Sequence, residues 1–313
     1  MIHDGKFLVK FRGIRGSHPT PSKDKLVYGG NTACVEVKVN GYLVVFDIGT
    51  GFISLGEDLF RNHIASGVSP ESREAVNVIG LVSHTHADHI QGFPFFKPAY
   101  LSSTKINLFG PKSNGTDFKQ TLSDYMLAKF FPVELDEIKA KLMITNIKEN
   151  DVIVLHPDNE NPQLITTNLL ERPEVKEDAV IIECMKSYAH PSGVLIYKIS
   201  FRGHSVVYAT DKESYIGGDV KLSSFARNTD LLIHDAQYTA DEYNSHIITK
   251  QGFGHSTPEM AIEVAKQAKA KKLVLFHIDP IYTDEVISEV EANLQKTHPN
   301  LFYAKENTEI EII

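Results

Sequence analysis

Three histidines and an aspartate stand close together in the segment SHTHADH, residues 83 to 89. Neutral imidazole and carboxylate groups are the usual ligands of zinc and similar divalent cations. His84 and His86 are two residues apart, so both rings point the same way in an extended loop. Asp88 and His89 can face a neighbouring position as the chain turns. Four such groups are too many for one tetrahedral ion with an open position, so the spacing predicts two ions side by side.

Each of these ions needs ligands from elsewhere in the chain, and three later residues are candidates. His190 lies in SYAHPSG between two predicted strands, Asp211 ends the strand VVYATD, and His277 ends the strand KLVLFH. Open α/β sheets bind their ligands at strand ends. A single histidine there is usually just a polar residue with satisfied hydrogen bonds. Three such residues beside a dense cluster predict metal ligands.

The elements that carry these residues can be read from the apolar pattern. CVEVKVNGYLVVFD predicts a hairpin that turns at Asn40-Gly41. A helix is expected over Ser54 to His63, and AVNVIGLVSH is a β-branched run that stops at His84. TDFKQTLSDYMLAKFF predicts an amphipathic helix. Its apolar residues stand four apart: Phe118, Leu122, Met126 and Phe130.

Strand patterns return after residue 180 in AVIIECMKS, GVLIYKIS, SVVYATD and DLLIHD. In STPEMAIEVAKQAKAKK a helix begins either with Ser256 and Glu259 as a capping box or with Thr257 as cap before Pro258. KLVLFH is a further strand, and TDEVISEVEANLQK a closing helix. This order predicts a layered α/β domain. No linker divides the chain, so one domain is expected over residues 1–313.

Composition narrows the class of protein. Of the 313 residues, 42% are hydrophobic, and the formal net charge is −8. A chain of this charge has no basic field for nonspecific binding of nucleic acid, which argues against a large nucleic acid as partner. Cys34 and Cys184 stand far apart in apolar runs and are expected to be buried thiols. No signal peptide or membrane span is recognisable, so we expect a cytoplasmic protein with no membrane partner.

The segment HTHADH resembles the H-x-H-x-D-H signature of the metallo-β-lactamase superfamily. The later His190, Asp211 and His277 follow in that family's order, and Asp47 matches its first acidic motif. The resemblance extends over nearly the whole chain. It implies an α/β fold, a four-layer αβ/βα sandwich with two divalent metal ions at one edge.

The same resemblance implies a role for each residue. It gives one ion the ligands His84, His86 and His190. It gives the other Asp88, His89 and His277, with Asp211 as the bridge between the ions. Asp47 would orient a ligand rather than bind metal. Histidine and carboxylate without thiolate suit zinc best, with manganese or iron as alternatives. Flavodiiron members of the superfamily have Glu where this chain has His86, which favours hydrolysis over oxygen chemistry.

A second resemblance concerns the bond that is hydrolysed. LLIHDAQY and GFGHSTPEMA resemble the "HEAT" and "HST" motifs of the ribonuclease Z-like phosphodiesterases, with Asp235 at the Glu position and His255 in "HST". Cleavage of a phosphodiester releases a basic alkoxide, which His255, oriented by Asp235, would protonate. A water activated by the two ions would attack phosphorus. The predicted catalytic residues are therefore Asp88, Asp235 and His255. Alternatively, Asp235 and His255 form only an ion pair at a helix edge.

The substrate is less defined. We find no basic Gly/Pro-rich arm of the kind with which ribonuclease Z grips transfer RNA, which favours a small or cyclic phosphodiester. Ala87 departs from the class II cyclic-nucleotide phosphodiesterase pattern. The aromatic FPFFKPAY either packs in the core or lines a base-binding pocket. One alternative is a carboxylic ester, thioester or lactone hydrolase on the same site, and another is a non-enzymatic metal-binding protein. Relatives are often dimers, so a homodimer is possible here by analogy only.

Overall fold

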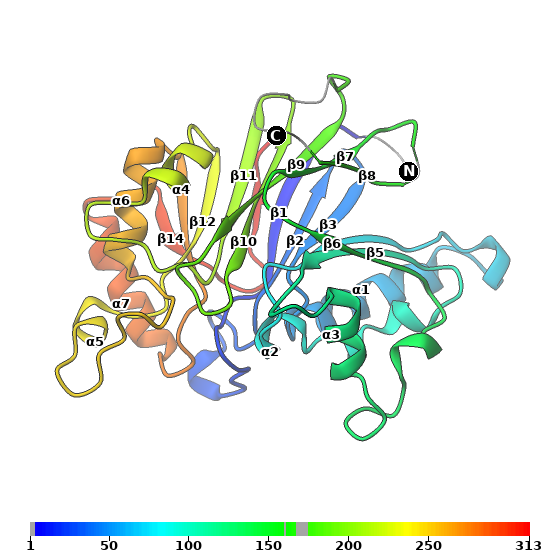
Figure 1. Ribbon diagram of the computed structural model, residues 1–313, viewed down its shortest axis with the longest axis horizontal. Helices are drawn as coiled ribbons and strands as arrows, with labels where there is room; N and C mark the ends of the chain where they lie inside the picture. Colours follow the sequence, from blue (N-terminus) through cyan, green and yellow to red (C-terminus); the bar gives the residue numbers. More distant parts are fainter. Residues whose placement is uncertain (1–3, 160, 167–174) are drawn as a thin grey trace.

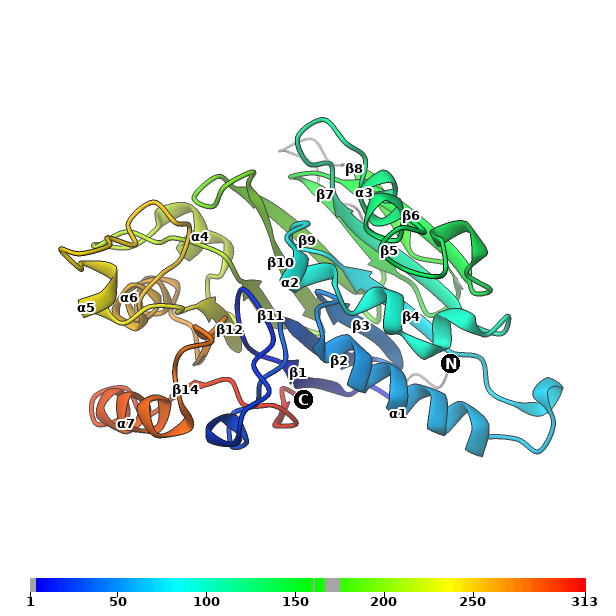
Figure 2. The same cartoon turned by 90° about the horizontal axis from the view of Figure 1, so that it is seen from below.

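The computed structural model describes residues 4–159, 161–166 and 175–313. Two sheets pack face to face, and helices cover their outer faces (Figures 1 and 2). One sheet has the strand order β15-β1-β2-β3-β4-β5-β6, and the other β14-β13-β12-β11-β10-β9-β7-β8. Helices α1 and α3 lie outside the first sheet, and α4, α6 and α7 outside the second. The predicted four-layer αβ/βα sandwich is confirmed.

The first sheet and its helices come mainly from the first half of the chain. Its strands are β1 (Phe7–Gly13), β2 (Cys34–Val39), β3 (Tyr42–Phe46), β4 (Asn77–Leu81), β5 (Lys105–Pro111), β6 (Lys141–Ile147) and β15 (Glu309–Glu311). The α-helices of this half are α1 (Gly51–Ala65), α2 (Ala87–Ile90) and α3 (Phe118–Tyr125). Short 3₁₀ turns occur at η1 (Lys23–Lys25), η2 (Pro70–Ser72), η3 (Phe93–Phe95), η4 (Lys97–Tyr100) and η5 (Leu135–Glu137).

The second sheet and its helices follow. Its strands are β7 (Asp151–Leu155), β8 (Gln163–Thr166), β9 (Val180–Ser187), β10 (Val194–Phe201), β11 (His204–Ala209), β12 (Leu231–Asp235), β13 (Lys272–Phe276) and β14 (Leu301–Tyr303). The α-helices are α4 (Val220–Phe225), α5 (Ala240–Tyr243), α6 (Pro258–Ala268) and α7 (Asp284–Gln295). Strands β11, β12, β13 and β14 run parallel, so their carboxyl ends meet at one edge.

Local signals set several of these boundaries. Asn40 and Gly41 have φ of 48° and 82°, the left-handed pair that a two-residue hairpin turn requires. Helix α6 begins at Pro258 behind Thr257, whose hydroxyl accepts from the backbone N–H of Met260, so the second of the two predicted caps is the one used. Helix α1 starts before and ends after the expected 54–63.

The amphipathic helix predicted up to Phe130 is too long. Helix α3 ends at Tyr125, because Met126 leaves the helical region of backbone conformation with φ −101° and ψ 18°. Phe118, Leu122 and Met126 are buried, whereas Phe130 is 72% exposed. The regular spacing therefore continues past the point where the core stops offering contacts, and the chain turns there instead.

The two sheets share one core, and that core reaches the edge where the candidate ligands gather. Phe46 stacks on Tyr208 across the sheets, with ring centroids 4.8 Å apart and planes 8° apart. The Tyr208 hydroxyl donates to Asp47 Oδ2 (2.7 Å). A second cluster lies between the first sheet and α1, where Phe52 stacks on Phe96. A single domain over 1–313 stays a prediction, which this shared core supports.

The cysteine prediction is confirmed, since Cys34 and Cys184 are free and buried. Burial raises the pKa of both thiols, that of Cys184 to about 12. Across the described ranges, none of the helices combines the length and apolar character needed to cross a bilayer.

Phe46→Ala is expected to lower the free energy of unfolding by about 3–5 kcal/mol, because it removes a fully buried ring between the sheets. The matched control is Phe130→Ala, which should change it by less than about 0.5 kcal/mol because that ring is exposed. Urea denaturation followed by circular dichroism measures both. Equal losses in the two variants would contradict the assignment of Phe46 to the core.

Candidate metal centre

The candidate ligands converge at the carboxyl edge of both sheets. His84 follows β4, His190 lies between β9 and β10, Asp211 follows β11, and His277 follows β13. Asp47 follows β3, which pairs with β4 in parallel. Strands from both halves of the chain thus deliver their ends to one place, as the sequence predicted.

Three of these residues have a left-handed backbone, which is uncommon for non-glycine residues. The φ angles are 55° at Asp47, 49° at Asp211 and 60° at His277. Each such residue costs about 1–3 kcal/mol and persists only where the surrounding structure fixes its conformation. The sharp turn directly after a strand aims each side chain into the centre. Three of the candidate residues at this centre therefore carry backbone strain.

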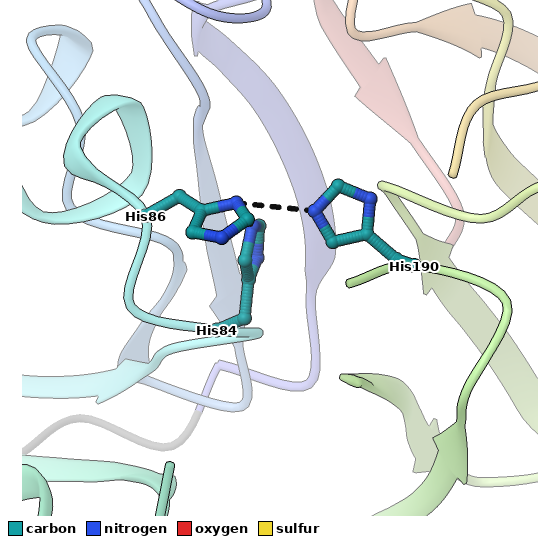
Figure 3. Close-up of side chains that lie close together, drawn as sticks. All are labelled: His84, His86 and His190. Atoms are coloured by element: carbon teal, nitrogen blue, oxygen red, sulfur yellow. Dashed lines mark hydrogen bonds between the residues drawn. The ribbon is translucent and has the colours of Figure 1, made fainter. Parts of the chain in front are cut away.

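The first group contains three imidazole rings that face one another (Figure 3). His86 Nδ1 lies 2.9 Å from His84 Nε2 and 3.1 Å from His190 Nε2. The outer nitrogens have their own partners: His84 Nδ1 lies 3.1 Å from Ser83 Oγ, and His190 Nδ1 lies 3.3 Å from the Gly254 carbonyl. Three ring nitrogens at one point suit a cation better than a proton shared among them.

The second group adds carboxylates to imidazoles. His89 Nε2 and His277 Nε2 lie 3.2 Å apart. Asp88 Oδ2 lies 3.3 Å from the first of these nitrogens and 3.2 Å from the second. Asp211 Oδ2 lies 3.1 Å and 3.3 Å from the same two nitrogens. A cation between these atoms would have two imidazole and two carboxylate ligands.

Asp211 lies between the two groups. Its other oxygen, Oδ1, is 3.6 Å from His84 Nε2 and 3.7 Å from His190 Nε2. Its side chain is almost fully buried. One carboxylate therefore presents one oxygen to each group, the arrangement that the predicted bridging role requires.

The rings of the second group are oriented from outside. His89 Nδ1 lies 2.7 Å from Asp47 Oδ2, and His277 Nδ1 lies 2.9 Å from Gln237 Oε1. Because both oxygens are acceptors, each ring donates its Nδ1–H outward and keeps the Nε2 lone pair for a metal. Asp47 also accepts from the backbone N–H and hydroxyl of Ser83. Its oxygens therefore face Ser83 and the outer nitrogen of His89, and its orienting role stays a prediction.

Electrostatics favour a positive ion in this space. Burial lowers the pKa of His84, His86 and His190, that of His190 to about 4. Burial alone would also lower the pKa of His89, but the charges of Asp211, Asp88 and Asp47 raise it well above its usual range. Burial opposes ionisation of Asp88, yet His89 and His277 hold its pKa well below its usual range. The acidic groups therefore stay ionised and attract cations.

Asp235 and His255 form a buried pair beside both groups. His255 Nδ1 lies 2.8 Å from Asp235 Oδ2. The His255 ring stacks on His277 with centroids 5.0 Å apart and lies edge-on to His190 at 5.1 Å. Burial alone would lower the pKa of His255, but the charge of Asp235 and its hydrogen bond raise it to about 9. Asp235 also accepts from the backbone N–H of Ser256 (2.8 Å), which fixes its orientation.

Sequence reasoning missed several supports of the centre. Gln237, which orients His277, stands two residues after Asp235, within the segment LLIHDAQY that resembles the "HEAT" motif. The backbone N–H of Ser17 donates to Asp88 Oδ2 (2.7 Å). Glu213 accepts from the backbone N–H of Gly254 (2.9 Å) and so holds the carbonyl that faces His190. None of these contacts has a sequence pattern that reveals it.

Close packing leaves no room for side chains at two glycines. A Cβ at Gly254 would lie 2.2 Å from His190 Nδ1, and the residue has φ +93°. A Cβ at Gly16 would lie 2.5 Å from the His277 ring. The neighbouring Arg15 does not face the centre: it is buried and donates to the carbonyls of Gly29, Asp279 and Tyr282. The distances given above bring all seven predicted metal ligands together. Their imidazole and carboxylate groups fit two divalent ions, and the role of each residue stays a prediction.

The comparisons with known proteins agree with this geometry. A sequence profile described as "Beta-lactamase superfamily domain" matches residues 44–278. The chain belongs to this superfamily of hydrolases. It is 30% identical to the ribonuclease Z of Lactococcus lactis subsp. lactis, covering 95% of this chain and 97% of that one. It is 24% identical to the ribonuclease Z of Pyrococcus horikoshii, covering 88% and 87%.

Solved structures share the fold. Human tRNase Z, short form, superimposes with a TM-score of 0.60 at 18% identity, covering 98% of this chain and 99% of that chain. A diphosphatase from the PhnP family gives a TM-score of 0.61 at 16% identity, covering 98% and 97%. The sequence-based resemblance to the ribonuclease Z-like branch is confirmed.

The prediction that argued against a large nucleic acid as partner is wrong. Relatives that match over most of the chain are named ribonuclease Z, so an acidic balance does not separate this chain from proteins that cut RNA. Net charge sums the whole molecule, whereas binding depends on the field at the site. Two divalent ions, with a combined charge of +4, would offset half of the formal charge of −8 at the candidate centre itself. Part of that charge is buried in the centre itself, at Asp47, Asp88, Asp211 and Asp235.

Asp47→Asn is expected to weaken zinc binding by about 10–100-fold, because Asn cannot hold the His89 tautomer with a charged acceptor. Competition with a chromophoric chelator measures the affinity. Asp136→Asn is the matched control, since that side chain is 89% exposed. If both variants bind zinc as the wild type does, Asp47 does not orient the ligand.

Proposed function

We propose that this protein is a dinuclear metal-dependent phosphodiesterase, with zinc as the preferred ion. His84, His86 and His190 would hold one ion, and Asp88, His89 and His277 would hold the other. Asp211 would serve both. When bound, the ions supply water activation and polarisation of a phosphoryl oxygen. The donor set of imidazole and carboxylate without thiolate supports zinc, and manganese or iron are the alternatives.

The observation that carries this proposal is the pair of Asp235 and His255. Its imidazole lies against the metal ligands His190 and His277 rather than at a solvent-facing helix edge. Asp235 is fully buried and His255 nearly so. An ion pair at a solvent-facing helix edge would be largely exposed, whereas this pair is not. A positioned proton donor beside a metal centre is what an alkoxide leaving group requires.

The residues of the chain divide the work accordingly. Asp235 accepts the Nδ1–H of His255 and so presents the opposite nitrogen, Nε2, to the substrate space. Burial alone would lower the pKa of His255, but Asp235 raises it, which favours a protonated ring that can donate from Nε2 to the departing oxygen. Asp88 is held by Ser17 and by two histidines, which fixes its carboxylate beside the reacting centre.

The size of the substrate is left open in this proposal. The preference for a small or cyclic diester depended partly on net charge, and that argument has failed. Relatives named ribonuclease Z make an RNA a necessary substrate in any screen. Cyclic nucleotides form the other arm of that screen. The second candidate function, ester or lactone hydrolysis, has the same metal groups but gives no use to Asp235 and His255.

Zinc-loaded or manganese-loaded protein is expected to hydrolyse bis(p-nitrophenyl) phosphate and to leave p-nitrophenyl acetate largely intact. Release of p-nitrophenolate, followed by absorbance, measures both rates. Asp211→Ala is the control and should lose the diesterase activity, because the carboxylate between the two groups is gone. Fast acetate cleavage with an inert diester would favour the ester or lactone alternative.

His255→Ala is expected to lower kcat/KM by about 10²–10⁴-fold on diesters that release an alkoxide. On bis(p-nitrophenyl) phosphate, whose leaving group is weakly basic, the loss should be much smaller. The contrast between the two substrate types is the readout. A uniform loss on both would assign His255 to structure or metal binding instead of proton donation.

A further inference from the structure

A cavity of about 580 Å³ lies beside the metal centre and has no part in the chemistry described above. Thr85 and Ala87 line it, and in the sequence they alternate with His84, His86 and Asp88. The cavity lining and the candidate metal ligands therefore come from one segment, residues 84 to 88, with Thr85 and Ala87 on the side of the cavity. Helices α2 and α3 contribute to this region (Figure 1).

The other walls are largely aromatic. Phe95, Tyr125, Phe130 and Phe131 line the cavity. Phe95 and Phe131 meet edge to face, with centroids 5.3 Å apart and planes 85° apart. Phe95 is 54% exposed and Phe130 is 72% exposed, so neither ring is buried in the hydrophobic core. Exposed rings beside a catalytic centre offer stacking surfaces to a planar heteroaromatic group.

One charged side chain of the lining determines which hydrogen-bonding groups of a ligand the cavity favours. Asp124, at the end of α3, is part of the lining. Asp124 is exposed, and Gln120 Nε2 donates to its Oδ1 (2.9 Å). An ionised carboxylate only accepts hydrogen bonds and can accept two at once. It therefore favours a ring edge with adjacent N–H donors and disfavours an edge that presents an acceptor.

We propose that this cavity binds the nucleobase of the nucleotide whose phosphodiester reaches the metal centre, and that Asp124 favours guanine. Guanine presents two adjacent N–H donors on its pairing edge, whereas adenine presents a ring acceptor beside its amino group. This inference deepens the proposed function, on which it rests: it makes the substrate a nucleotide diester.

The test is a set of binding measurements on the zinc-loaded protein by isothermal titration calorimetry. Guanosine 5′-monophosphate, adenosine 5′-monophosphate and ribose 5-phosphate are the probes. The wild type should bind the guanine nucleotide at least about tenfold more tightly than ribose 5-phosphate, because stacking adds to the phosphate contact. Adenosine 5′-monophosphate should bind with intermediate affinity.

Two variants and one control separate the base from the phosphate. Phe130→Ala should reduce the advantage of both nucleotides over ribose 5-phosphate, and Asp124→Asn should remove the preference for guanine over adenine. The control Leu127→Ala removes a partly exposed side chain from the same turn that does not line the cavity, and should change nothing.

Equal binding of all three probes by the wild type would overturn the proposal. So would a loss in Phe130→Ala that Leu127→Ala matches. Because the readout is binding and not turnover, the two proposals can fail separately. A protein that shows this pattern but cleaves no phosphodiester retains the base site and loses the proposed function.

Discussion

The structure depends on the burial of many acidic and imidazole groups in one small volume. Asp88 and Asp211 lie within 3.3 Å of the inward nitrogens of His89 and His277, and all four side chains are buried. Buried charge without compensation is among the most costly arrangements in a protein. The Nδ1 protons of His89 and His277 are already donated to Asp47 and Gln237, so they cannot compensate the charges of Asp88 and Asp211. Cations at the inward nitrogens resolve the remaining imbalance.

The rest of the fold serves to hold these groups in place. The stacked pair of Phe46 and Tyr208 fixes the two sheets against each other, and the Tyr208 hydroxyl extends that contact to Asp47. Left-handed residues directly after strands turn the ligands inward at the cost of backbone strain. Glu213 and Gly254 support His190 from the far side. The stability of the shared core thus offsets the strain of the centre.

Much of this arrangement could be predicted because its signals are local or familiar. The Asn40-Gly41 turn, the strands that stop at polar residues and the HTHADH segment are all visible within a few residues. The rest depends on contacts between distant segments. Gln237 orients His277 across 40 positions, and the Ser17 N–H reaches Asp88 across 71. The end of α3 at Tyr125 was missed because periodicity cannot tell where the core ends. The partner was misjudged because net charge carries no information about the field at one site.

The central claim is that two cations occupy this centre, one in each group. Anomalous diffraction from crystals of the zinc-loaded protein, recorded on both sides of the zinc absorption edge, tests it most directly. The account predicts two anomalous peaks. One would lie among His84, His86 and His190, the other among Asp88, His89 and His277, with Asp211 in contact with both. A single peak, or a peak outside these groups, would contradict it.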